Sequence, residues 1–238
     1  MQERIVRVLE SDPELGESLD PVRFERALPE AIAKVRHLPA GTWEEPDWPE
    51  EVRSGYGLLL LDGLLVRRVH LGGRDGGELL SAGDLLRPWQ REDASASVMR
   101  SSGWRVLDRA EVAVLDIRFA QRVSPYPEIA SQLMARTLRR ARNFAVIMTI
   151  VHQRRVDVRL LMLLWHLADR CGRVGPNGVL VPMRLTHAIL AELLAARRPT
   201  ISAALGSLER EELLEQTSAG WLLHGSPPGE MAVIADAG

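Results

Sequence analysis

The sequence is poor in cysteine and contains no long hydrophobic run. Its single cysteine, Cys171, excludes an internal disulfide framework and a cysteine-ligated cluster within one chain. No apolar stretch reaches the roughly 18 residues that would span a bilayer. Residues 1–9 lead into an amphipathic pattern and not a signal peptide. We therefore expect a cytoplasmic protein without a membrane partner, in which Cys171 is a half-buried thiol at a helix end.

The sequence also lacks the residue groupings that carry catalysis or bind metal ions. None of its six histidines has metal-ligand spacing with a supporting cysteine or carboxylate cluster. The glycine-rich residues 72–77 lack the Lys-Ser/Thr ending of a phosphate loop, and no nucleophile motif is recognisable. We therefore predict that the chain is not an enzyme and holds no metal or cofactor.

Charge is distributed unevenly along the chain, although the formal net charge is only −2. Residues 136–215 carry 13 Arg and 7 Asp or Glu, which is a net charge of +6. Residues 1–135 carry 17 Lys or Arg against 23 Asp or Glu, which is −6, and the remainder carries two acids. A basic segment attached to an acidic one is typical of a nucleic-acid-binding module fused to another domain.

The N-terminal half changes character near residue 40. Residues 1–40 place apolar side chains at helical spacing, with Asp20 as a cap, and predict a helical extension. Over residues 41–125, short apolar runs alternate with glycine-rich turns, and Asp62-Gly63 is a strong hairpin signal. This pattern predicts an antiparallel β-barrel or jelly roll.

A long helix is predicted within residues 126–155, where Pro127 suits the first turn. Residues on it recur at a spacing near three and a half, which favours pairing with the same helix of a second copy. This seam comprises Ile129, Leu133, Arg136, Arg140, Phe144, Ile147 and Val151. The alternative is a helix that packs only on its own barrel.

Residues 156–225 predict a second domain, and residues 226–238 a flexible tail. An almost wholly apolar helix over residues 158–170 is the expected core of this domain. Together with the barrel and the long helix, the sequence predicts an α+β protein.

The second domain contains the pattern of a winged helix-turn-helix. Thr186 can cap a helix that runs to about Arg197, and Pro199 suits the first turn of the next helix. That second helix turns Ile201 and its apolar neighbours inward and leaves small polar side chains outside. Residues 215–223 predict a hairpin, or wing, after it.

The side chains at the start of this second helix suit the major groove of DNA. Arg197 or Arg198 can bind guanine O6 and N7 together, for about 1–3 kcal/mol of discrimination. Thr200 and Ser202 can bind phosphates, and Ala203 can contact a thymine methyl. The candidate DNA-binding residues are Thr186, Arg197, Arg198, Pro199, Thr200, Ser202 and Ala203. The alternative is an ordinary helical hairpin with a solvated arginine pair.

Residues 185–202, with the apolar positions that follow up to Leu214, resemble the winged helix-turn-helix of the Crp/Fnr family of bacterial transcription regulators. The order of parts over residues 43–223 is also similar to that family. The resemblance implies a homodimer that reads a palindromic operator in double-stranded DNA, with RNA polymerase as a further possible partner. It also implies that Arg198 is the recognition arginine and Thr200 a phosphate-binding residue.

Three residues of the helix-turn-helix depart from the family pattern. Pro199 replaces a common glutamate and Ala203 a further arginine, so the half-site should differ from the family's best-known operators. Ala195 replaces the usual turn glycine, which is tolerable if Ala195 stays helical.

The barrel departs from the pattern of family members that bind cyclic AMP. The Gly-Asp turn is present at residues 83–84, but Arg87-Pro88 replaces the following Gly-Glu pair, and Ala94-Ser95 stands near the later Arg-Ser pair. Arg87 would fill the phosphate niche and Pro88 removes an amide donor, so a cyclic-AMP response is not expected. Haem ligation by His70, as in a carbon-monoxide sensor of this fold, has no other support in the sequence.

A different effector pocket is the remaining expectation for the barrel. It would be lined by Arg87, Trp89, Arg91 and Trp104, with arginine for an anion and tryptophan for a ring. The alternative is that the tryptophans simply fill the barrel.

The sequence therefore predicts a homodimeric, sequence-specific DNA-binding regulator with a degenerate effector barrel and an unknown effector. A small-molecule sensor that acts through protein contacts, and a DNA binder that needs no ligand, are the alternatives.

Overall fold

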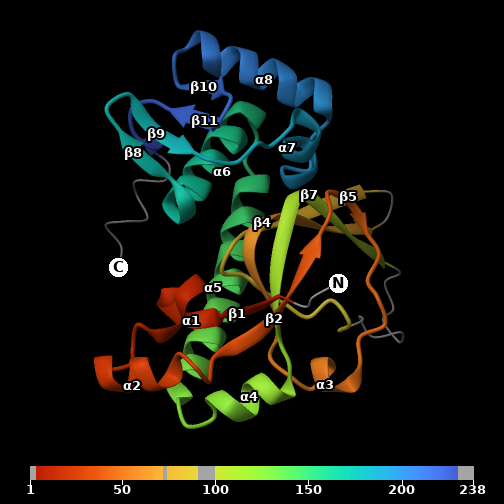
Figure 1. Ribbon diagram of the computed structural model, residues 1–238. Coiled ribbons are helices and arrows are strands. Elements are labelled where there is room, and N and C mark those ends of the chain that lie inside the picture. The colour runs from red at the N-terminus through yellow and green to blue at the C-terminus, as the bar shows by residue number, and fades with distance from the viewer. Residues whose placement is uncertain (1–3, 72–73, 91–99, 230–238) are drawn as a thin grey trace. The chain divides into compact units, whose positions relative to one another are not determined.

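The computed structural model describes residues 4–71, 74–90 and 100–229, and Figure 1 shows its ribbon. The chain divides into two compact units. The first unit is formed by residues up to 143 without 74–77, and the second by residues from 144 onward with 74–77.

The first unit is built on an antiparallel seven-stranded sheet. Its strands follow the order β1-β2-β7-β4-β5, while β3 pairs with β7 and β6 pairs with β4. The strands are β1 Ile5–Arg7, β2 Ile32–Leu38, β3 Gly41–Trp43, β4 Gly57–Leu71, β5 Arg74–Leu80, β6 Leu85–Leu86 and β7 Arg100–Leu115. The sheet is not closed, because β1 and β5 are its two ends and do not pair with each other. The antiparallel β-structure expected for residues 41–125 is therefore present, but as an open sheet and not as a barrel.

Asp62-Gly63 does not form the hairpin turn that its sequence suggests. Strand β4 continues through both residues, and its register against β7 shifts between Leu60 and Leu65. Gly63 has a φ of 94°, and a Cβ there would lie 2.6 Å from the Cα of Ala110. Glycine is therefore required where the strand bulges against its neighbour.

The prediction that residues 1–40 are helical is only partly right. The helical parts are α1 Val8–Ser11, the 3-10 helix Pro13–Gly16 and α2 Pro21–Ala27, which Asp20 caps through two backbone amides at 3.0 Å. Ile32–Leu38 is instead strand β2, which pairs with β7 along its length. Ala33 and Val35 are buried while Lys34 and Arg36 are exposed, a period of two that is typical of a strand and that the prediction of helical spacing missed.

Two apolar clusters cover the two faces of the sheet. Leu59 and Ala113 belong to a cluster with α1, α2, α4 (Ile117–Val123) and the start of α5 (Pro127–Val151). Their strand neighbours Leu58, Leu60 and Val112 belong to the other cluster, which includes Val52 of α3 (Glu50–Arg53). Because successive side chains of a strand point to opposite faces, the helices of the first cluster share one face of the sheet.

Helix α5 buries the first part of the predicted seam, whereas Phe144 of the same seam is 50% exposed. Ile129 and Leu133 are buried in the first unit, and Arg136 is only 4% exposed. Leu133 and Arg136 are therefore unavailable to a second copy, which corrects this part of the seam. Apolar side chains that do face solvent recur at spacings of four and three residues, and we call them the α5 stripe: Met134, Leu138, Ala141, Ala145 and Met148.

The second unit combines three helices with a four-stranded sheet of order β10-β11-β9-β8. Helix α6 (Val156–Cys171) supplies its core, as predicted, with eight buried residues from Leu160 to Leu167. The remaining elements are β8 Arg173–Gly175, β9 Gly178–Val181, α7 His187–Leu193, α8 Arg198–Arg210, β10 Leu214–Thr217 and β11 Gly220–Leu223. Cys171 is half-buried at the end of α6, as expected.

Neither a membrane span nor a metal cluster is found in the part of the chain that the structure covers. No helix there is both long and apolar enough to cross a bilayer. No group of three or more His, Cys, Asp or Glu side chains among those same residues is placed to hold a metal ion.

Candidate nucleic-acid interface and ligand pocket

The first helix of the predicted helix-turn-helix is shorter than expected. The hydroxyl of Thr186 caps α7 by accepting a hydrogen bond from the amide of Ile189 at 3.3 Å. The helix ends at Leu193 and not near Arg197, because Ala195 takes the left-handed conformation with a φ of 48°. The condition under which alanine in place of the turn glycine is tolerable, that Ala195 stays helical, is therefore not met. This geometry lets the amide of Ala196 bind the carbonyl of Ala191 at 2.9 Å, which closes the helix end.

The second helix, α8, begins where the sequence predicts. Arg197 is its extended N-cap, and Pro199 lies in the first turn, where its missing amide costs no helical hydrogen bond. Its buried face consists of Ile201, Ala204, Leu205 and Leu208, as predicted. The four buried residues orient the remaining face of α8 toward solvent.

The predicted DNA-binding residues lie on exposed parts of these two helices. The exposed residues are Thr186, Arg197, Arg198, Pro199, Thr200, Ser202 and Ala203. Six of them belong to the N-cap and first turns of α8, so their grouping follows from the helix itself. The result is a small surface with two unburied guanidinium groups and side chains that leave the backbone accessible.

One residue of this surface was missed by the sequence reasoning. His187, the first residue of α7, places its ring Nδ1 2.9 Å from the hydroxyl oxygen of Ser202 on α8. The hydroxyl of Ser202 in turn donates to the carbonyl of Arg198 at 3.1 Å. The two residues are 15 positions apart, so only the packing of α7 on α8 brings them together.

The predicted wing is present as the hairpin of β10 and β11. Residues 214–217 pair with residues 220–223, and β11 also pairs with β9. The hydroxyl of Thr217 accepts from the amides of Ala219 and Gly220 at 3.2 and 3.1 Å, which fixes the turn. The unpredicted strand β8 adds a second hairpin with β9 at the far edge of this sheet.

The first unit contains a pocket of about 800 Å³ that includes part of the predicted effector site. Arg87 and Trp104 line it, together with Trp43, Arg67 and Arg140. The ring of Trp104 lies 5.8 Å from that of Trp43 and 6.0 Å from the Arg67 guanidinium. The pocket therefore combines cationic and aromatic side chains with two acidic residues, Glu44 and Glu45.

Trp89, a third residue of the predicted effector site, does not line this pocket. Trp89 packs against Trp48, with ring centroids 5.8 Å apart, and belongs to the apolar cluster of the sheet. The Arg87 guanidinium lies 5.9 Å from the Trp89 ring and donates to the Arg53 carbonyl at 2.7 Å. Arg91 lies outside the described residues.

Helix α5 contributes Arg140 to the wall of the pocket. The guanidinium of Arg140 binds both carboxylate oxygens of Glu78, at 2.6 and 2.7 Å, and the Leu85 carbonyl at 2.9 Å. Burial lowers the pKa of Arg140, but the hydrogen bonds and charge of Glu78 outweigh it, so that the pKa is raised. Arg140 is therefore a fixed cation between α5 and the strands β5 and β6.

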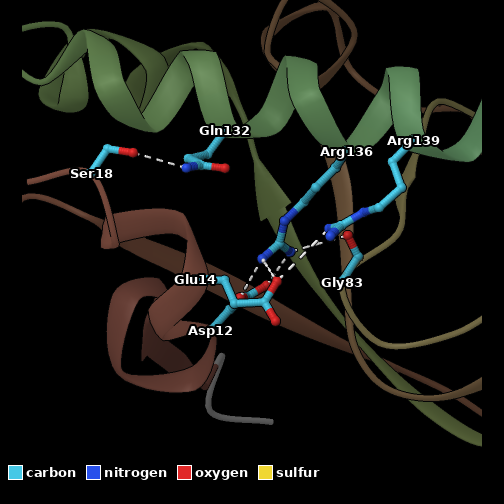
Figure 2. Close-up of polar contacts among 7 residues, drawn as sticks. All are labelled: Asp12, Glu14, Ser18, Gly83, Gln132, Arg136 and Arg139. Atoms are coloured by element: carbon cyan, nitrogen blue, oxygen red, sulfur yellow. Dashed lines mark hydrogen bonds and ion pairs between the residues drawn. The ribbon is translucent and has the colours of Figure 1, made fainter. Parts of the chain in front are cut away.

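One turn earlier on α5, Arg136 joins three segments of the first unit. Figure 2 shows its guanidinium between Asp12, Glu14 and the carbonyl of Gly83. Nearby, the Gln132 amide donates to the hydroxyl of Ser18 at 3.0 Å. These contacts fasten the N-terminal segment and the Gly83-Asp84 turn to the helix.

A model of the Crp-like helix-turn-helix domain matches residues 158–224. This range contains α6 from its third residue onward, both helices of the predicted helix-turn-helix and the wing. No curated protein was found to match the chain.

Three solved structures that are similar to most of the chain are distant from it in sequence. A cyclic nucleotide-binding domain containing protein from Listeria monocytogenes has 16% identity and a TM-score of 0.63, over 89% of this chain and 96% of the other. A CooA mutant from Carboxydothermus hydrogenoformans has 16% identity and a TM-score of 0.61, over 99% and 97%. A transcriptional regulator of the CRP family from Thermus thermophilus has 21% identity and a TM-score of 0.55, over 79% and 91%. At these identities the likeness concerns the fold.

Proposed function

Because this chain has the Crp-like helix-turn-helix domain and the fold of a Crp/Fnr-type regulator, we propose that it is a homodimer that reads a palindromic DNA site. The observation that carries this proposal is the exposed start of α8, where Arg197 and Arg198 stand beside small side chains. A helix of this kind can enter the major groove, and an arginine at its N-terminal end can bind guanine.

The charge at the start of α8 supports the same proposal. Arg197 and Arg198 are adjacent and exposed there, whereas Arg136 and Arg140 lie on α5 and are paired with Asp12 and Glu78. Neutralised phosphates release counterions, so binding should weaken steeply as salt rises. Thr200 and the backbone of the wing are the further groups that we assign to phosphate contacts.

The α5 stripe supports the dimer. Met134 and Leu138 are 67% and 53% exposed, although the free energy of an apolar side chain falls when it is buried. The stripe repeats at a coiled-coil spacing, and two small alanines at its centre allow two helices to approach closely. A second copy of α5 is therefore its proposed occupant.

The pocket lined by Arg67, Arg87, Arg140, Trp43 and Trp104 is the proposed effector site. Its composition does not match the Gly-Glu pair that holds the phosphate of cyclic AMP in the resembled family, so we propose that the effector is a different molecule. A ligand acts by binding one arrangement of α5 more tightly than another. Arg140 is the residue that connects the pocket to that helix, because it belongs to α5 and lines the pocket.

The proposal is tested by selecting bound DNA from a random pool with the full-length chain. We expect enrichment of a palindrome with half-sites about one DNA turn apart, roughly 10 base pairs. Arg198→Ala should weaken binding of the selected site by about 1–3 kcal/mol, or roughly 5- to 150-fold. Arg210→Ala, at the other end of α8, is the matched control and should change affinity little. Enrichment of no sequence would favour a sensor that acts through protein contacts instead.

A further inference from the structure

The first unit contains a second groove, with a volume of about 360 Å³. It shares no lining residue with the pocket that contains Trp43, Arg67 and Trp104. Its walls come from β1, β2, the end of β7, α4, and α3 with the segment that leads into it. All of these elements belong to the first unit, and β1 is the edge strand of its sheet.

The strand register explains why a groove forms at this edge. Ile5 on β1, Lys34 on β2 and Val114 on β7 are direct partners, so their side chains form one row on one face of the sheet. Val114 is 6% exposed and belongs to the apolar cluster that includes Val52 of α3. Ile5, at the other end of the row, is 61% exposed. The apolar cover of this face therefore stops partway along the row and leaves apolar side chains at the bottom of a groove.

Four cations and two carboxylates line the rest of the groove. These charged residues are Lys34, Arg36, Arg118, Arg122, Glu51 and Asp116. Two of them already have partners in the fold. Arg122 donates to the carbonyls of Glu30 and Ile32 at 3.0 and 2.5 Å. Asp116 accepts from the amide of Phe119 at 2.8 Å.

Arg36 and Arg118 are the two cations placed to bind a ligand. Both are exposed, and neither forms an ion pair with any residue that the structure describes. The Arg36 guanidinium lies 5.8 Å from the ring centroid of Trp48, a side chain of the groove that is only 4% exposed. The aromatic face therefore attracts the cation to this position. A guanidinium can bind both oxygens of a carboxylate.

The composition of the groove favours a small monoanion with an apolar body. A phosphate group carries nearly two negative charges at neutral pH, and the exposed carboxylate of Glu51 in the same lining would repel it. A carboxylate carries one charge, and an apolar body attached to it would bury Ile32, Trp48 and their neighbours. The groove is near the lower end of ligand-pocket volumes, which are roughly 300–1,000 Å³, so the ligand is small.

We propose that this groove binds a small carboxylic acid with an apolar ring or chain. Arg36 and Arg118 hold its carboxylate, and its apolar part lies on the side chains at the bottom of the groove. The site is separate from the proposed effector pocket and does not depend on DNA binding by α8. Because the walls come from several elements of the first unit, a bound acid stabilises that unit.

The test is the binding of benzoate and hexanoate to the full-length chain, followed by ligand-observed NMR titration. Benzamide and hexanamide are the neutral probes of matched shape. We expect both acids to bind with dissociation constants of about 1 mM or below. The amides should bind at least about tenfold more weakly, because they cannot form charge-assisted hydrogen bonds to arginine.

Substitutions then locate the site. Arg36→Gln and Arg118→Gln should each weaken binding of the acids by about three- to tenfold. Arg26→Gln is the matched control, because Arg26 is an exposed arginine of α2 that does not line the groove, and it should change nothing. Gly103→Leu adds a side chain to the proposed effector pocket, where a Cβ meets nothing within 4 Å, and should leave binding of the acids unchanged.

The proposal is wrong if the acids bind no more tightly than the amides, or if neither acid binds at concentrations up to about 10 mM. It is also wrong if Gly103→Leu abolishes binding while Arg118→Gln does not, since the acids would then occupy the effector pocket. Circular dichroism of each variant checks that its fold is intact. None of these outcomes bears on the proposed reading of DNA, which is tested separately.

Discussion

The guanidinium of Arg136 binds the carboxylate of Asp12, a residue that precedes it by 124 positions. Both partners are largely hidden from water, since their side chains are 3% and 13% exposed. The same guanidinium donates to the Gly83 carbonyl at 3.1 Å. One buried cation thus joins the N-terminal segment, the Gly83-Asp84 turn and the α5 helix, and the stability of the first unit should depend on it.

Arg136→Met should destabilise the chain by about 3–5 kcal/mol, because it leaves a buried carboxylate without its partner. Urea unfolding followed by circular dichroism measures the loss. Arg139→Met is the matched control: Arg139 is 60% exposed and reaches only Glu14, at 3.8 Å, so we expect a loss below about 1 kcal/mol. Adding Asp12→Asn to Arg136→Met should recover part of the loss, and no recovery would contradict the assignment of the loss to an unpaired charge.

Leu138→Asp should convert a dimer to a monomer, because it places a charge within the α5 stripe. Sedimentation velocity of the full-length chain measures the change. Val146→Asp is the control, since Val146 is 40% exposed on the same helix but outside the stripe. A Leu138→Asp chain that sediments as the wild type does would exclude the stripe as the interface.

Ala195→Gly should stabilise the second unit by up to about 1 kcal/mol. The left-handed conformation costs a residue with a Cβ about 1–2 kcal/mol, and glycine avoids this cost. Part of the gain is lost again, because glycine makes the unfolded chain more flexible and so raises the entropy lost on folding. Ala195 is exposed, so no packing is lost. Thermal unfolding should shift upward by a few degrees for Ala195→Gly and downward for Ala196→Gly, whose backbone needs no glycine. Equal losses for both variants would argue against strain at Ala195.

Stability should fall below neutral pH because of His166, which is buried in α6. Burial lowers the pKa of His166, and Arg170 lowers it further, while Asp169 opposes them. The unfolded chain therefore binds the proton at a pH where the folded chain does not. The stabilisation is complete above about pH 6.5 and decreases as pH falls toward the lowered pKa of the folded state. Urea midpoints from pH 7.5 to 5.5 should decrease less for His166→Gln than for the wild type, and parallel curves would refute the assignment.

The helix-turn-helix was predictable because its signals are local. A capping threonine, a proline in the first turn and apolar residues at helical spacing all act within a few positions of α7 and α8. The end of α7 was not predicted, since the left-handed Ala195 is imposed by the packing of the two helices and not by its own preference. His187 was missed for the same reason, because its partner lies on another helix.

The outcome for α5 shows where spacing alone fails. Arg136 and Arg140 lie on the buried side of α5, where an apolar repeat would not be expected to place a charged residue. Their carboxylate partners, Asp12 and Glu78, are distant in sequence and adjacent only after folding. The pattern identified one seam on the helix, but the first residues of this seam, Ile129 and Leu133, pack on the chain's own sheet and not on a partner.

The central claim is that two copies of α8 read one DNA site as a rigid pair, and one measurement tests it most directly. The affinity of the full-length chain should be compared between the selected palindrome and the same palindrome with five base pairs inserted at its centre. Five base pairs turn one half-site about half a helical turn away, so the account predicts that affinity falls to that of unrelated DNA. An unchanged affinity would mean that each helix-turn-helix binds independently, and would contradict the proposed dimer.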